Sequence, residues 1–242
     1  MDDIFAVHGL NGHYRETWTD RSKSKPAIMW LEDLLPEKLP GCRVMSFEYD
    51  DSVNSMSVTS VRDAARSLFE LLRDKRENTT SANIPIVFVG HSLGGIVIKQ
   101  ALVLAGDDYP DMTNCTKGIL HAAHWALLVK KIAGAVFRRP RSAFLEILQK
   151  SSDGLYRISE DFRPISANYA IISFYEEYAY KIWGKVIVDK HSAIMGLPHE
   201  QKMILSGTYT LICRFLKGDK QFDAVWKRIS RAASGVRQPG AR

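Results

Sequence analysis

The stretch from Ile84 to Ala105 places the strongest constraint on how this chain can fold. It reads IPIVFVGHSLGGIVIKQALVLA. Its first part, through Val89, is apolar and rich in β-branched residues, the pattern of a strand buried on both faces. After a glycine-rich break, Ile96 to Leu104 is again apolar and contains enough helix formers to predict a buried helix. The stretch therefore predicts a buried strand that turns directly into a helix.

The break between the two halves has the form G-x-S-x-G, with Ser92 at its centre. In a nucleophile elbow the serine occupies a tight, strained turn, and glycines two residues before and after it prevent side-chain clashes. Gly90 and Gly94 are at those positions. The helix that follows would direct backbone N–H groups and a positive dipole end toward a developing oxyanion. Because G-x-S-x-G also occurs by chance, an ordinary strand-to-helix turn is the alternative interpretation.

A second glycine-rich loop supports the elbow interpretation. Ile4 to Val7 predicts a short strand, and HGLNG follows it. In this kind of site one oxyanion donor is the N–H after the nucleophile, here Leu93, and the other comes from the loop after an earlier strand. Leu10 is the candidate for the second donor, because glycines at 9 and 12 allow a close approach to substrate. A plain glycine turn is the alternative.

The remaining apolar runs predict strands that alternate with helices. Val58 to Leu72 places apolar residues on one helical face, and Phe222 to Ile229 is a second amphipathic helix. Such alternation predicts an α/β fold with a mostly parallel sheet, helices on both faces, and functional residues at the carboxyl ends of the strands. The other expected strands are Cys42–Tyr49, Thr116–Ala123, Tyr169–Tyr175, Lys185–Val188 and Lys202–Leu205.

Length and composition limit the number of domains and the cellular location that we expect. A chain of 242 residues with 45% hydrophobic content predicts one domain, over residues 1–233, and a disordered tail at 234–242. No apolar run reaches the roughly 18 residues of a membrane span, and the acidic start is unlike a secretory signal. Three widely spaced cysteines without a metal motif indicate reduced thiols, hence an intracellular location, in the cytoplasm or in another reducing compartment.

The segment from about 125 to 168 is expected to form a small helical cap. Ala126 to Phe137 is amphipathic, and three arginines follow around Pro140. A lid that contacts an anionic membrane is one interpretation of this pattern, and a surface helix with a solvated basic face is the more common one. His121 and His124 lie at the end of the preceding strand, where a metal role would need further ligands nearby and strand-end packing or hydrogen bonding is the alternative. The net charge of +6 is moderate, and no aromatic stacking module accompanies it, so no nucleic-acid partner is expected.

Several segments together resemble the serine esterase and lipase-like α/β-hydrolases. They are VHGLNGHYRETWT, WLEDLLPEKLPGCRVMSFEYD, VFVGHSLGGIVIKQALVLA, IISFYEE, VIVDKHSA and LSGTYTLICRF. They resemble most the fungal branch, where such a domain often precedes NACHT or ankyrin modules, and they are also similar to the serine active site-containing proteins of lipid remodelling. The resemblance covers roughly residues 4 to 230. It implies an α/β-hydrolase fold, shortened at its N-terminus, and a Ser-acid-His triad that acts on a carboxylester or lipid ester without a cofactor.

Two positions depart from the family pattern. The family has a T-P-H-R-G-like run after the sixth strand, where this chain reads HAAHWALL and only His124 matches. The family places its catalytic histidine before a T-x-I/M-C-R-F-like run, and this chain has Tyr209 before TLICRF. Tyrosine has a pKa near 10, against about 6.5 for histidine, so it is a poor base at neutral pH.

The sequence therefore leaves open both the triad and the function. For the acid, Glu176 fits best, and Glu177 and Asp189 are the alternatives. His199, His191 or His124 could replace the missing base only with a remodelled loop. One hypothesis is a serine ester hydrolase impaired by Tyr209. The other is a catalytically inactive pseudohydrolase that serves as a ligand-binding or protein-interaction module.

Overall fold

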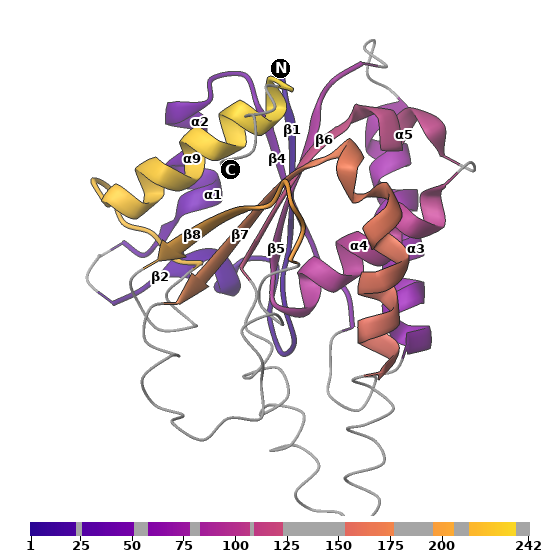
Figure 1. Ribbon diagram of the computed structural model, residues 1–242. Coiled ribbons are helices and arrows are strands. Elements are labelled where there is room, and N and C mark those ends of the chain that lie inside the picture. The colour runs from indigo at the N-terminus through magenta and orange to yellow at the C-terminus, as the bar shows by residue number, and fades with distance from the viewer. Residues whose placement is uncertain are drawn as a thin grey trace, which may run out of the picture.

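The computed structural model describes residues 1–22, 26–50, 58–77, 83–106, 109–122, 153–176, 196–205 and 213–235. Within them, a six-stranded sheet forms the centre of the fold (Figure 1). Each strand is one of the apolar runs expected from the sequence. The strands are β1 (Asp3–Val7), β4 (Arg43–Phe47), β5 (Ile86–His91), β6 (Thr116–Ala122), β7 (Ala170–Glu176) and β8 (Gln201–Leu205). The expected strand at Lys185–Val188 lies outside the described residues.

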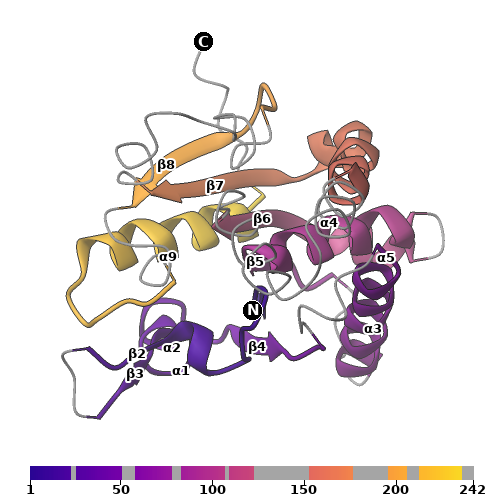
Figure 2. The same ribbon diagram turned by 90° about the horizontal axis from the view of Figure 1, so that it is seen from below.

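All neighbouring strands of this sheet are parallel, in the order β4-β1-β5-β6-β7-β8. The register aligns the last residues of the strands: Val7 pairs with Gly90, His91 with Ala122, and Glu176 with Leu205. The carboxyl ends of the strands therefore lie along one edge of the sheet, which faces the viewer in Figure 2. The parallel sheet predicted from the sequence is confirmed.

Helices cover both faces of the sheet and bury two apolar layers. On one face lie α3 (Val58–Glu77), α4 (Leu93–Ala105) and α5 (Pro110–Cys115). The other face carries α1 (Trp30–Asp33), α2 (Leu35–Lys38) and α9 (Lys220–Ala233), with the small antiparallel pair β2 (Thr19–Asp20) and β3 (Ile28–Met29). Since consecutive strand side chains alternate between faces, Phe88 packs in the first layer and Val87 in the second.

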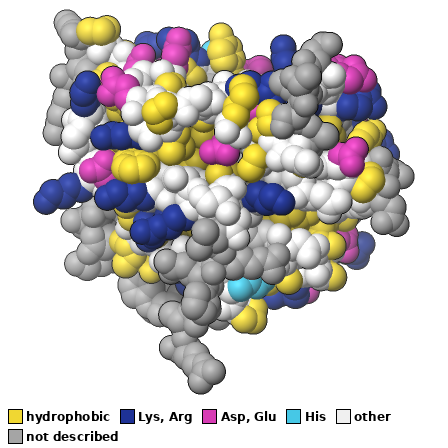
Figure 3. All heavy atoms as spheres, turned by 90° about the horizontal axis from the view of Figure 1, so that it is seen from above, with side chains coloured by type: hydrophobic (Ala, Val, Ile, Leu, Met, Phe, Trp, Pro, Cys, Tyr) yellow, Lys and Arg dark blue, Asp and Glu magenta, His cyan; other side chains and the backbone are white. Residues whose placement is uncertain are grey.

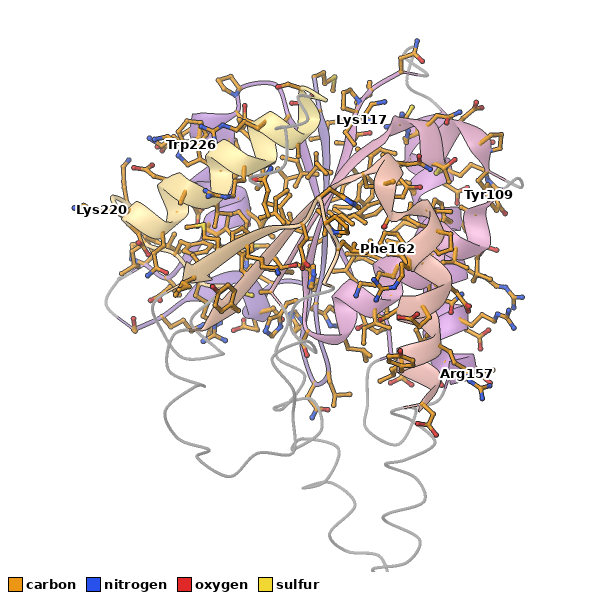
Figure 4. The ribbon with its side chains drawn as sticks, viewed as in Figure 1. Tyr109, Lys117, Arg157, Phe162, Lys220 and Trp226 are labelled. Atoms are coloured by element: carbon orange, nitrogen blue, oxygen red, sulfur yellow. The ribbon has the colours of Figure 1, made fainter. Side chains whose placement is uncertain are left out.

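Part of the segment expected to be a cap packs against the sheet. Residues 153–162 are helical, and the 3-10 helix η3 (Arg163–Asn168) leads into β7. Leu155, Ile158 and Phe162 are buried in the same layer as α3 and α4. Phe162 lies on the inner side of this helix, whereas Arg157 points outward (Figure 4). Residues 153–168 thus complete one face of the sheet, and the rest of the expected cap lies outside the described residues.

At the amino-terminal ends of the strands, the buried carboxylate of Asp3 binds two arginines. Asp3 is fully buried and binds Arg43 through two hydrogen bonds of 2.7 and 2.6 Å. It also binds Arg76, at the end of α3, at 2.5 Å. On the surface seen from this end, acidic and basic side chains are interspersed (Figure 3). No helix among the described residues is long and apolar enough to cross a membrane.

Candidate functional site

Ser92 occupies the junction between β5 and α4, as the motif predicts. Its backbone has φ 53° and ψ −118°, a sparsely populated region that costs a non-glycine residue about 1–3 kcal/mol. The Ser92 N–H donates to the Ala122 carbonyl at 2.8 Å, which ties the turn to the end of β6. Such strain persists only where the surrounding structure enforces it, and it is the backbone feature of a nucleophile elbow.

The two glycines of the motif are required by backbone contacts. A Cβ added to Gly94 would lie 2.2 Å from the Val7 carbonyl oxygen and 2.4 Å from that of His8. A Cβ added to Gly90 would lie 2.8 Å from both the Cα and the N of Gly95. No side chain fits at these distances, so the expectation that glycine is needed at both positions is confirmed.

The loop after β1 lies directly against the serine. A Cβ added to Gly9 would be 2.7 Å from the Ser92 Cβ. The Gly12 N–H donates to the Gly9 carbonyl at 2.8 Å, which closes a four-residue turn with Asn11 at a φ of 52°. In a trans peptide the C=O and N–H point in opposite directions. Because the Gly9 carbonyl points into the turn, the Leu10 N–H points out of it.

The second candidate donor begins α4. Leu93 is the first residue of the helix, and the first four N–H groups of a helix have no acceptor within the helix itself. Within this turn, the Gly95 N–H donates to the Ser92 carbonyl at 3.1 Å. Ser92 therefore has a helix N-terminus on one side and the loop of Leu10 on the other, the general arrangement of an oxyanion hole.

The described residues do not place a histidine on the serine hydroxyl. The Ser92 Oγ is buried and has no hydrogen-bond partner there. His199 precedes β8, at the opposite end of that strand from the edge where Ser92 lies, and its Nε2 is 3.0 Å from the Ser166 carbonyl. This position does not favour His199 as the base. Tyr209, His124 and His191 lie outside the described residues.

The candidate acid is at the expected edge. Glu176 is the last residue of β7, and its backbone pairs in register with Leu205 at the end of β8. The segment that contains Tyr209 begins directly after Leu205. The two alternative acids, Glu177 and Asp189, lie outside the described residues.

Sequence reasoning missed a buried polar network beside the elbow. His121 of β6 has its Nε2 2.8 Å from the Ser173 Oγ of β7, and Ser173 donates to the Oε1 of Glu200, just before β8. Since the single hydroxyl proton of Ser173 goes to the carboxylate, His121 must donate from Nε2. A Cβ added to Gly95 would lie 3.3 Å from the His121 Cβ, so the network reaches the first turn of α4.

A buried lysine interacts electrostatically with this network. Burial lowers the pKa of Lys99, on α4, to about 8, and the positive charge of Arg163 adds to this effect while Glu200 opposes it. Burial and the charge of Lys99 lower the pKa of His121 to about 3, so His121 is neutral. The only hint in the sequence was a serine inside the apolar run of β7. Ser173 is fully buried, so this network is no second hydrolytic triad.

No group of three or more candidate metal ligands gathers within the part of the chain that the structure describes.

Known proteins resemble this chain over most of its length. No protein-family model matches the chain. Protein SERAC1 of Bos taurus is 28% identical over 224 residues, covering 81% of this chain and 34% of that protein. Protein SERAC1 of Danio rerio is also 28% identical, over 223 residues with the same coverage. The chain thus spans about a third of the length of the curated relatives it matches.

Solved structures share the fold at low sequence identity. A carboxylesterase of Nitrososphaera gargenis superposes with a TM-score of 0.56 and 12% identity, covering 97% of this chain and 92% of that one. Monoglyceride lipase from Saccharomyces cerevisiae gives a TM-score of 0.55 and 13% identity, covering 98% and 88%. The fold expected from the resemblance is confirmed, and the fungal branch stays a prediction.

Proposed function

Because the chain has the α/β-hydrolase fold found in esterases and lipases, we propose that it is a serine ester hydrolase domain. Its substrate is a carboxylester or a lipid ester, and Ser92 is its nucleophile. The observation that carries this proposal is the strained backbone of Ser92, held between the loop of Gly9 and the first turn of α4. An ordinary strand-to-helix turn has no need of that strain.

In the proposed reaction the Ser92 Oγ attacks the ester carbonyl carbon and the alcohol leaves. The N–H groups of Leu10 and Leu93 stabilise the negative charge that develops on the carbonyl oxygen. Removing one such donor typically slows turnover by about 10²–10³-fold. Water then attacks the acyl-enzyme by the same route, the carboxylic acid leaves, and Ser92 recovers its proton.

The proposed site lacks a histidine at the position expected for the general base. Tyr209 takes the position of the catalytic histidine after β8, and Glu176 at the end of β7 is the acid that would orient an imidazole there. A tyrosine hydroxyl has a pKa near 10, so it seldom accepts the proton of Ser92 at neutral pH. In a serine protease, loss of the base alone costs on the order of a million-fold in turnover. The natural chain is therefore a slow hydrolase.

The second candidate function is a pseudohydrolase that uses the same site to bind a ligand or a protein partner. Tyr209 in the sequence favours it. The two candidates differ in whether Ser92 can still form an acyl-enzyme.

The test is hydrolysis of a short-chain p-nitrophenyl ester by the wild-type chain and by Tyr209→His, each with a matching Ser92→Ala control. The variant supplies a group of suitable pKa at the position where the resembling family has one. We expect it to hydrolyse the ester faster than the wild type, and Ser92→Ala to remove the gain. Recovery will be partial if the loop at HAAHWALL has also altered the pocket.

Two results would contradict the proposal. A Tyr209→His chain that folds normally but gains no Ser92-dependent hydrolysis favours the pseudohydrolase. A wild-type chain that is already fast, and that His199→Ala inactivates, shows that the base is elsewhere.

A further inference from the structure

We propose that Tyr49 is a positioning residue for the oxyanion hole. Its hydroxyl fixes the orientation of the loop that contains Leu10. The inference rests on the proposed function, because it assigns a role within the same site. It concerns the segment just after β4, which lies beside β1 in the sheet.

Tyr49 contacts the loop in two ways. Its hydroxyl donates to the His8 carbonyl at 2.9 Å. Its ring stacks on the His8 ring, with centroids 4.6 Å apart and planes 13° apart. Phe47 stacks on Tyr49 in turn, at 5.6 Å and 12°. Phe47 pairs in register with Val7 at the ends of β4 and β1. This pairing positions Tyr49 and His8, which follow these strand ends, for the hydrogen bond between them.

The loop needs such a contact because glycines begin and end its turn. The Gly12-to-Gly9 hydrogen bond sets the direction of the Leu10 N–H within the turn. Glycine populates more backbone conformations than any other residue, so Gly9 leaves the orientation of the whole turn relative to β1 to other contacts. The His8 carbonyl and the Gly9 N–H belong to one planar peptide. Holding that carbonyl therefore fixes the peptide plane from which the backbone enters Gly9, where it lies against Ser92.

The other end of the loop is held by the same segment. The Oε2 of Glu48 accepts from the Tyr14 N–H at 2.6 Å and lies 3.5 Å from the His8 Nε2. The hydroxyl of Ser46 donates to the Tyr14 carbonyl at 2.6 Å. Both ends of the loop are thus bound to residues 46–49, and the hydroxyl of Tyr49 binds the backbone at the end nearer in sequence to Leu10. It can also be removed without removing its ring.

The test variant is Tyr49→Phe, which keeps the stacked ring and removes only the hydroxyl. The control is Tyr156→Phe, which removes a hydroxyl from an exposed tyrosine on the helix at 153–162. Both are made in the wild-type and Tyr209→His chains. The measurements are hydrogen exchange of the amides at residues 9–12 and the separate kcat and KM for a short-chain ester.

We expect Tyr49→Phe to speed amide exchange at residues 9–12 and to lower kcat about tenfold with KM unchanged. The loss is smaller than the 10²–10³-fold that follows removal of a donor, because the Leu10 N–H is misdirected rather than absent. Loss of a contact that only stabilised the fold would not lower kcat selectively while KM stayed unchanged. Tyr156→Phe should change neither measurement.

Failure of this inference differs from failure of the proposed function. If Tyr209→His shows no Ser92-dependent turnover, the proposed function is refuted, and unchanged exchange in Tyr49→Phe would also refute the loop contact. If Tyr209→His turns over but Tyr49→Phe alters neither exchange nor kcat, only the role of Tyr49 is wrong. A rise in KM with kcat unchanged would also overturn it, because Tyr49 would then act in substrate binding.

Discussion

Replacing Asp3 by asparagine should destabilise the whole fold. Asp3 is fully buried in β1, and its carboxylate binds the guanidinium groups of Arg43 and Arg76. Asparagine keeps the shape of the side chain but removes its negative charge. The two arginines, whose side chains are 25% and 10% exposed, would then face each other without a counter-charge.

The expected loss follows from this burial. Removing one partner of a buried ion pair typically costs about 3–5 kcal/mol, because the remaining charge stays out of water without compensation. Asp3 balances two arginines, and its hydrogen bond raises the pKa of Arg43, which shows the direction of their coupling. With a urea m-value of about 3 kcal/mol/M, the unfolding midpoint should fall by about 1 M or more.

The assay is urea unfolding followed by far-ultraviolet circular dichroism, with Glu32→Gln as the matched control. That variant breaks the ion pair between Glu32 and Arg15, which are 2.7 Å apart. Their side chains are 58% and 49% exposed, respectively. An exposed pair contributes less than about 1 kcal/mol. If Asp3→Asn loses no more stability than Glu32→Gln, the view that Asp3 anchors the sheet is wrong.

Two further predictions concern the site. Burial lowers the pKa of Lys99 from 10.5 to about 8, so between these values the unfolded chain binds a proton that the folded chain does not. The unfolding free energy of wild type relative to Lys99→Met should therefore rise with pH across that window, by up to about 3 kcal/mol, and a flat difference would contradict the burial of a charged lysine. Gly94→Ala should lose about 3 kcal/mol or more in urea unfolding because its Cβ would meet the Val7 carbonyl oxygen at 2.2 Å. Gly41→Ala, at a φ of 83° with nothing within 4 Å, should lose only about 1–2 kcal/mol, and equal losses would refute the steric argument.

The features of the fold that could be predicted from sequence are those that a local pattern encodes. The run before Gly90 has the composition of a buried parallel strand, and it is one. The glycines at 90 and 94 serve a turn whose backbone contacts lie within a few residues or on one adjacent strand.

The features that could not be predicted depend on partners far apart in the chain. Ser173 is 52 residues from His121 and 27 from Glu200, so no local pattern shows that they meet. Asp3 looked like part of an acidic terminus, because its partner Arg76 is 73 residues away. Residues 153–168 were assigned to a cap because they follow a basic amphipathic stretch, and only packing shows that Phe162 belongs to the core.

The central claim, that Ser92 is a nucleophile in an oxyanion-binding turn, is tested most directly by a fluorophosphonate probe. The probe is incubated with the wild-type chain, Tyr209→His and Ser92→Ala, and the adduct is located by peptide mass spectrometry. Our account predicts an adduct on Ser92 alone, formed faster in Tyr209→His than in wild type and absent from Ser92→Ala. An adduct on another residue, or none on a folded Tyr209→His chain, would contradict it.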